Sequence, residues 1–276
     1  MNYDRILDLV MSAMQDETTW RKTWQSQPGL HQNWVTKHVY SGTNQLMTMI
    51  ASWKYGYTQP YWLTYKQVID LGGNVKGQKA TPAIYFGSGK DKKDEDKTYK
   101  FAKPYNIFNI EQTGIELPPI EMRQTKLERP YEIAQALNVE VESAPHHNPS
   151  YSPSRDLIRM PMPGQFESDD AHQSTFYHEC IHATGHHSRL DRDMTGAFGS
   201  EDYAKEEFVA ELGSVFLCAE LGVTYDLQQH ASYFNSWQKA IESDPKYLLK
   251  AATAARKATE YCMSQFTLMR KYDKAA

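Results

Sequence analysis

Two histidines four residues apart bracket a glutamate in the stretch HECIH, which runs from His178 to His182. On a helix, this spacing places both imidazoles on one face, close enough to bind a single metal ion. Glu179 lies one residue further round the helix, where its carboxylate can reach a water molecule in the ion's open coordination position. This is the H-E-x-x-H pattern of zinc peptidases. The ion lowers the pKa of the water, and the glutamate moves the water's proton to the leaving amine.

These residue types predict a catalytic metal centre with His178 and His182 as ligands and Glu179 as the catalytic base. The alternative is a solvated, histidine-rich helix end. The neighbouring residues favour the metal centre, because Phe176 and Ile181 are apolar at helix positions that should be buried. Zinc is the expected ion, and Mn²⁺ or another divalent metal is compatible with the same ligands.

A centre of this kind needs a third protein ligand, and the sequence offers two kinds. In the longer pattern H-E-x-x-H-x-x-G-x-x-H the third ligand is a histidine, but Ser188 occupies that position. A carboxylate can come instead from a later helical stretch, where Glu207 and Glu211 lie four residues apart on one face. In zinc peptidases with a His-His-Glu site, the ligand glutamate is followed four residues later by an acid that orients a ligand histidine. This pattern favours Glu207 as the ligand and Glu211 as the orienting acid, and the reverse assignment stays open. Glu206 is expected to face solvent.

Peptide hydrolysis also needs a donor for the oxyanion of the tetrahedral intermediate. Two residues near the predicted centre can serve. Tyr203 lies one turn before Glu207, and His187 follows the histidine motif.

Charge and aromatic residues divide unevenly along the chain. The formal net charge is −4, yet residues 1–130 contain 17 Lys and Arg against 13 Asp and Glu, whereas residues 131–276 contain 13 against 21. Residues 20–85 contain a single acid, Asp70, and five of the six tryptophans. Cations for phosphates and flat side chains for bases are what a groove for single-stranded nucleic acid requires. The alternative is that these aromatics form the core of a small α+β domain.

The side chains expected to contact single-stranded DNA are basic, aromatic or amide groups of this first half. They are Arg21, Lys22, Trp24, Tyr40, Asn44, Lys54, Tyr57, Trp62, Lys66, Lys76 and Lys79.

Turn signals and hydrophobic periodicity indicate the elements that must position these residues. In the first half they predict an N-terminal amphipathic helix, helices at 44–54 and 65–71, and strands at 80–86 and 99–110. In the second half they predict strands at 140–144 and 155–161 with a loop between them, and helices at 169–186, 201–221, 227–243 and 245–268. The expected fold class is α+β. A mixed α/β domain at 1–125 precedes a mainly helical domain with a short sheet at 126–276.

Composition limits the compartment. No stretch approaches the roughly 20 apolar residues of a membrane span, and the first residues lack the basic and apolar regions of a signal peptide. Cys180, Cys218 and Cys262 are far apart and odd in number, so a disulfide framework is not expected. These features indicate a cytoplasmic protein whose cysteines are small core residues.

In their order along the chain, these motifs resemble the ArdC-type antirestriction proteins of conjugative plasmids and their phage relatives. The likeness of the first half rests on YSGTNQLMTMIA, YWLTYKQVIDLGGNVKGQKATPAIYF and PYNIFNIEQTGI. The likeness of the second half rests on YSPSRDLIRMP, FYHECIHATGHHSRLDRDM and YAKEEFVAELGSVFL. The family pairs an N-terminal single-stranded-DNA-binding domain with a C-terminal zincin-like metallopeptidase domain.

The resemblance implies protection of incoming DNA from host restriction, with a peptidase that cuts an unidentified DNA-associated protein. It implies His178 and His182 as metal ligands and Glu179 as the catalytic base. It supports a carboxylate third ligand without choosing between Glu207 and Glu211.

Two other hypotheses compete with this one. The protein could shield single strands stoichiometrically, with a non-catalytic metal site, or its basic half could bind a protein or an anionic surface. Glu179 favours an enzyme, because a structural zinc site does not need it.

Overall fold

The computed structural model describes residues 29–90, 98–119, 131–196, 200–225 and 244–273. They fall into two compact units. The N-terminal unit comprises the described residues of 31–119, and the C-terminal unit comprises residues 29–30 and those of 131–273. The expected domain boundary between residues 125 and 126 lies outside the described residues, as do the N-terminal amphipathic helix and the helix at 227–243.

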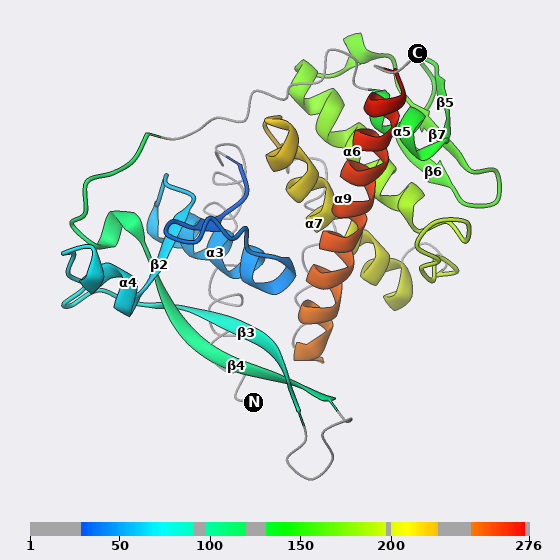
Figure 1. The fold of residues 1–276 in the computed structure, drawn as a ribbon. Helices are drawn as coiled ribbons and strands as arrows, with labels where there is room; N and C mark the ends of the chain where they lie inside the picture. Colours follow the sequence, from blue (N-terminus) through cyan, green and yellow to red (C-terminus); the bar gives the residue numbers. More distant parts are fainter. Residues whose placement is uncertain (1–28, 91–97, 120–130, 197–199, 226–243, 274–276) are drawn as a thin grey trace. The chain divides into compact units, whose positions relative to one another are not determined.

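The N-terminal unit is built on a four-stranded sheet. Its strands are β1 (Gln32–Asn33), β2 (Tyr61–Thr64), β3 (Thr81–Lys90) and β4 (Thr98–Asn109), in the order β1-β2-β4-β3. β1 runs parallel to β2, and the other two pairs are antiparallel. Its helices are α3 (Gly42–Tyr55), α4 (Tyr65–Asp70) and the single 3₁₀ turn η2 (Ile110–Gln112). β3 and β4 pair over ten residues and form a long twisted ribbon (Figure 1).

Local signals explain where these helices begin and end. α3 ends at Gly56, whose φ of 74° is the left-handed conformation that glycine adopts without a Cβ penalty. α4 begins at Thr64, which forms a reciprocal capping box with Gln67. Both signals are visible in the sequence, so the predicted bounds of both helices agree with the structure to within two residues. The core beside α4 comprises Tyr61, Leu63, Val68, Val75, Phe108 and Ile110.

The C-terminal unit is mainly helical and carries a short sheet. Its helices are α5 (Glu132–Leu137), α6 (Asp169–Thr184), α7 (Glu201–Leu221) and α9 (Pro245–Asp273), with the 3₁₀ turn η3 (Pro163–Gln165). Its strands are β5 (Glu140–Ser143), β6 (Ser150–Ser152) and β7 (Leu157–Met160), in the order β5-β7-β6. β5 is parallel to β7, and β6 is antiparallel to β7. The predicted α+β class and the mainly helical second half with a short sheet are confirmed.

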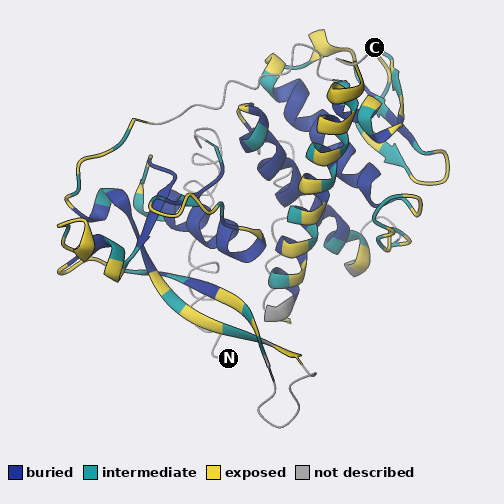
Figure 2. Cartoon of the chain, in the orientation of Figure 1, coloured by how far each residue is buried: buried dark blue, intermediate teal, exposed yellow. Residues whose placement is uncertain are grey.

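α6 is the central element of the C-terminal unit. It packs against α5, α7, α9 and the sheet, and residues 171–184 are all buried (Figure 2). A helix buried on every side must find partners for each polar side chain that it carries. α6 carries several, including His178, Glu179 and His182.

Several elements differ from those predicted. β6 lies inside the segment that was expected to be a loop. Pro149 and Pro153 favoured a loop there, but they flank a strand of only three residues at the sheet edge, where proline is tolerated. β1, β2 and α5 were not predicted, and α9 continues five residues beyond residue 268. All three cysteines are buried and unbridged, as predicted. Within the described ranges, the helices lack the combination of length and apolar content needed to cross a membrane.

Candidate metal centre

Helix α6 positions the histidine motif. Ser168 caps its first turn by accepting a hydrogen bond from the Ala171 amide at 3.0 Å. Asp169 and Asp170 follow in the first turn, where acids complement the helix dipole. The spacing of the two histidines then places them one turn apart and near the end of the helix.

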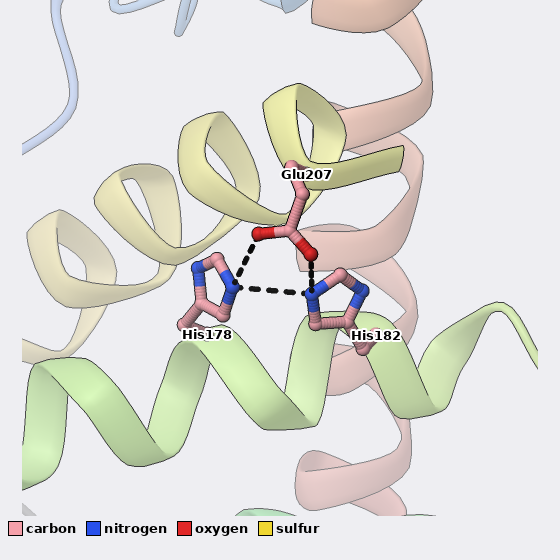
Figure 3. A group of neighbouring side chains, drawn as sticks. All are labelled: His178, His182 and Glu207. Carbon is pink, nitrogen blue, oxygen red and sulfur yellow. Dashed lines mark hydrogen bonds and ion pairs between the residues drawn. The ribbon is translucent and has the colours of Figure 1, made fainter. Parts of the chain in front are cut away.

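Three donor groups converge on one point between α6 and α7 (Figure 3). The Nε2 atoms of His178 and His182 lie 3.1 Å apart. The Glu207 carboxylate approaches both, with Oε2 3.6 Å from Nε2 of His178 and Oε1 3.3 Å from Nε2 of His182. Bonds of about 2.0–2.1 Å in a tetrahedral zinc site separate two ligand atoms by about 3.3 Å. The donor types and their spacing therefore fit a divalent cation held by three protein ligands.

The Glu206 carboxylate contacts Nδ1 of His182, the ring nitrogen that faces away from the convergence point. Glu206 Oε1 lies 3.2 Å from Nδ1 of His182, so a proton on Nδ1 leaves Nε2 facing the convergence point. Arg192 clamps Glu206 through two bonds, from Nε at 3.0 Å and from Nη2 at 2.7 Å. Arg192 also donates to the Ile181 carbonyl at 2.8 Å, which ties the clamp to α6. Glu206 is buried, so the expectation that it faces solvent is wrong.

A second carboxylate holds the outer nitrogen of His178. Glu211 Oε2 lies 3.4 Å from Nδ1 of His178, and the Tyr225 hydroxyl donates to the same carboxylate. Glu211 is thus directed at Nδ1, whereas Glu207 is directed at both Nε2 atoms. This geometry favours Glu207 over Glu211 as the third ligand. Sequence reasoning missed Glu206, Arg192 and Tyr225 as partners of the centre.

The electrostatic balance suits a cation. Burial alone would lower the pKa of His182, but two glutamate carboxylates outweigh it and raise the pKa to about 9. The same competition raises the pKa of His178. Burial would raise the pKa of Glu207, and the two histidines lower it instead. A bound cation would replace the imidazole protons as the positive partner of the Glu207 carboxylate.

A pocket opens beside the three donors. Glu179, Thr175, Tyr203 and Tyr151 of β6 are among the residues that line it, together with the donors themselves. Burial raises the pKa of Glu179, although the nearby histidines and a hydrogen bond from the Tyr151 backbone lower it in part. Of the two predicted oxyanion donors, Tyr203 lines the pocket. His187 is exposed and is not among the lining residues, so its prediction has no geometric support.

Arg189, which follows α6, links α5, α6 and the turn between β6 and β7. Arg189 forms a two-pronged ion pair with Asp156, at 2.8 and 2.7 Å. It also donates to the carbonyls of Leu137, at the end of α5, and Ala183, at the end of α6. The Tyr151 hydroxyl donates to Asp156 at 2.7 Å, which links β6 to the same network. No single-residue signal in the sequence pointed to Arg189.

The predicted DNA contacts have very different positions. Arg21, Lys22 and Trp24 lie outside the described residues. Lys66, Lys76 and Lys79 are exposed, and Lys54 and Tyr57 are half-buried.

Tyr40, Asn44 and Trp62 are buried, with exposed fractions of 2%, 8% and 0%. Asn44 joins α3 to β3 through two bonds with the Ile84 backbone, at 2.7 and 2.8 Å. The Trp62 indole donates to His31 at 3.2 Å. Interior groups of this kind cannot stack on a base or meet a phosphate, so we do not retain these three as DNA contacts.

Two protein-family models match the chain. Residues 1–108 match the N-terminal domain of the anti-restriction factor ArdC. Residues 128–254 match a zincin-like metallopeptidase domain, MPTase-PolyVal.

Known proteins match over most of the chain. Two DNA primases TraC of Escherichia coli are 36% identical over 274 residues, or 89% of this chain. The chain spans only 25% and 18% of the length of these two relatives. The uncharacterized protein y4eC of Sinorhizobium fredii is 29% identical over 285 residues, which cover 95% of this chain and 92% of that protein.

Crystal structures of the antirestriction ArdC protein from the R388 plasmid have the same fold. The metal-free structure has a TM-score of 0.81 and 31% identity, and the Mn(II)-bound structure has a TM-score of 0.80 and 32% identity. Each comparison covers 96% of this chain and 98% of the other. The chain belongs to the ArdC family of antirestriction proteins, with a zincin-like domain in its second half.

Proposed function

We propose that the protein is a metal-dependent endopeptidase of the cytoplasm that is recruited by single-stranded DNA and cleaves a DNA-associated protein, thereby protecting incoming DNA from restriction. The observation that carries the proposal is the convergence of His178, His182 and Glu207 beside the buried carboxyl of Glu179. Zinc is the proposed ion, with manganese as the alternative, since the R388 protein has been crystallised with Mn(II).

The described side chains have the roles that peptide hydrolysis requires. A divalent cation held by His178, His182 and Glu207 would supply the Lewis acidity that activates water and polarises a peptide carbonyl. Glu179 accepts a proton from the attacking water and transfers it to the leaving amine. Its pKa, raised by burial, suits a group that must both accept and release a proton near neutral pH. Tyr203, on the pocket wall, is the proposed donor to the developing oxyanion.

The pocket wall also supports a peptide as the substrate. β6 is one of the two edge strands of its sheet in the described part of the C-terminal unit, and its residue Tyr151 lines the pocket. An edge strand offers backbone donors and acceptors to an extended chain. A substrate paired with β6 would pass beside Glu179, so cleavage within a chain is favoured over cleavage at its ends.

Two features favour catalysis over a structural metal site. A structural zinc site fills its fourth position with a protein ligand, whereas three groups converge here among the described residues. Glu179 has no role in holding such an ion, yet it lines the same pocket. For the N-terminal unit, the exposed Lys66, Lys76 and Lys79 support binding to a polyanion.

The proposal is tested by labelling new protein N termini in an extract of restricting cells. The metal-loaded protein is added together with oligo(dT), and Glu179→Gln serves as the matched control because it keeps the three ligands and the side-chain shape. We expect new N termini with the wild type that are absent with the variant and with excess chelator. If the wild type generates none, the endopeptidase proposal fails, and stoichiometric shielding of single strands takes its place.

A further inference from the structure

Three aromatic rings lie in a row on one face of the β3–β4 ribbon. Tyr85 and Tyr99 are 57% and 54% exposed, and Phe101 between them is partly exposed. The register pairs Tyr85 with Lys103, Gly87 with Phe101 and Gly89 with Tyr99, so all of these residues share one face. The Phe101 ring centroid lies 6.1 Å from that of Tyr85 and 6.1 Å from that of Tyr99. We call Tyr85, Tyr99 and Phe101 the aromatic face.

Gly87 and Gly89 allow the rings of Phe101 and Tyr99 to pack directly against the ribbon. A Cβ at Gly87 would stand 2.6 Å from Cζ of Phe101, and a Cβ at Gly89 would stand 3.0 Å from Cζ of Tyr99. Any side chain at either position would push the ring above it out of place. The Phe101 ring therefore packs against Gly87, and the Tyr99 ring packs against Gly89. Exposed and half-buried residues alternate along this part of the ribbon (Figure 2).

The charges of the ribbon complement an anion. Neither strand contains an acid, and their charged residues are Lys90, Lys100 and Lys103. Lys103 Nζ lies 5.1 Å from the centroid of the Phe101 ring, on the aromatic face. A row of exposed rings with Lys103 beside it, and with no acid in either strand, favours a partner that combines flat apolar groups with negative charge. Single-stranded DNA does so, whereas the duplex hides the faces of its bases.

We propose that the aromatic face is the platform on which bases of single-stranded DNA stack, with Lys103 contacting the phosphates. The inference rests on the proposed DNA binding and names the surface responsible. It also assigns the stacking to residues outside the predicted set, because Tyr40 and Trp62, which were expected to contact DNA, are buried.

The test uses the full chain and the fluorescence anisotropy of labelled oligo(dT). In the test variant, Tyr85, Tyr99 and Phe101 are each replaced by Leu, which keeps an apolar cover over the glycines but removes the rings. Loss of one stacked base weakens binding by about 5-fold to 150-fold, so we expect at least a tenfold loss here. The matched control is Phe86→Leu, because Phe86 is 62% exposed on the opposite face of the same ribbon. The affinity of this control variant for oligo(dT) should equal that of the wild type.

The salt dependence of oligo(dT) binding distinguishes the contribution of the rings from that of Lys103. Lys103→Gln should lower the slope of log K against log salt concentration by about 0.7, the value for one phosphate contact with a single strand, whereas the triple Leu variant should keep the wild-type slope. Photocrosslinking of wild-type protein to oligonucleotides containing 5-iodouracil does not depend on any variant folding. Its crosslinks should map to the aromatic face.

Each contrary result has a distinct meaning. If the wild type does not bind oligo(dT), the proposed DNA binding fails and the inference fails with it. If the wild type binds but the triple variant binds equally and crosslinks map elsewhere, only the assignment of the surface is overturned. Self-association of the wild type that the triple variant loses would assign the face to a second copy instead, and would also overturn the proposal.

Discussion

The two units use their functional side chains in opposite ways. In the C-terminal unit, imidazoles and carboxylates are buried and held by second partners, as in the pairs Glu206 with His182 and Glu211 with His178. In the N-terminal unit, the candidate functional groups are exposed: the rings and Lys103 of the β3–β4 ribbon, and Lys66, Lys76 and Lys79 outside it. Buried charge is costly without a partner, so the first arrangement is rigid and intolerant of substitution. An exposed surface tolerates change and loses affinity only in small steps.

The largest expected effect on stability comes from Arg189→Ala. The change leaves Asp156 without its ion pair, removes the arginine donor to the Leu137 carbonyl and removes one of the donors to the Ala183 carbonyl. We expect a loss of about 3 kcal/mol in the free energy of unfolding of the C-terminal unit. Urea unfolding measures this loss of free energy. The transition of the C-terminal unit is recognised as the one whose midpoint shifts when divalent metal is added.

Arg189→Lys is the matched control for that change. It keeps the charge but not the planar fork, so an intermediate loss is expected. In the N-terminal unit, Lys66→Ala should change stability by no more than about 0.5 kcal/mol. Equal effects of Arg189→Ala and Lys66→Ala would show that the contrast between the units is wrong.

Removal of metal should affect one unit only. Zinc or manganese at about a hundred times its dissociation constant should stabilise the C-terminal unit by about 2.7 kcal/mol, and chelator should abolish this gain. Calorimetry of the full chain measures it. Glu207→Gln should remove most of the metal-dependent shift, because it weakens one of the three converging donors. A shift that survives Glu207→Gln in full would remove Glu207 from the ligand set.

The partners behind the ligands should matter less than the ligands themselves. Glu206→Gln and Arg192→Ala each loosen the hold on Nδ1 of His182. We expect metal affinity to fall about 10-fold to 100-fold, as measured by competition with a chromogenic chelator. Glu220→Gln is the control, since Glu220 lies on the same helix but pairs with Arg256 instead. Unchanged affinity in the Glu206 variant would mean that His182 is oriented without it.

The smallest effects are expected for the exposed lysines. Lys66→Gln, Lys76→Gln and Lys79→Gln should each weaken binding to oligo(dT) only a few-fold and lower the salt slope by at most about 0.7. Stability should not change. Salt titrations of the three variants measure this. A lysine whose loss leaves the slope unchanged makes no phosphate contact.

Local periodicity made the C-terminal centre predictable. His178, Glu179 and His182 are related by the geometry of one helix, and Glu207 and Glu211 by the geometry of another, so their mutual arrangement follows from spacing. Glu206 was misjudged because a single helix gives its direction but not the arginine that approaches from a neighbouring loop. Arg192 comes from outside both helices, and spacing carries no information about it.

The N-terminal surface was less predictable because sheet register and pairing decide which rings are buried. Tyr40 and Trp62 have the same residue types as exposed DNA-binding groups, yet pairing of β2 with β1 and β4 places Trp62 in the interior. Tyr85, Tyr99 and Phe101 lie in strands that were predicted, but none of them was among the expected DNA contacts. Their common face follows from the register of β3 with β4, which local sequence patterns do not specify.

The most direct test of the central claim is protection of incoming plasmid DNA in a restricting host, with the wild type compared with Glu179→Gln. The variant should first be shown to bind metal and oligo(dT) as the wild type does. We predict that the wild type protects the DNA and that the variant does not, because Glu179 moves the proton in peptide hydrolysis. Equal protection by the two proteins would contradict the account and would assign antirestriction to DNA binding alone.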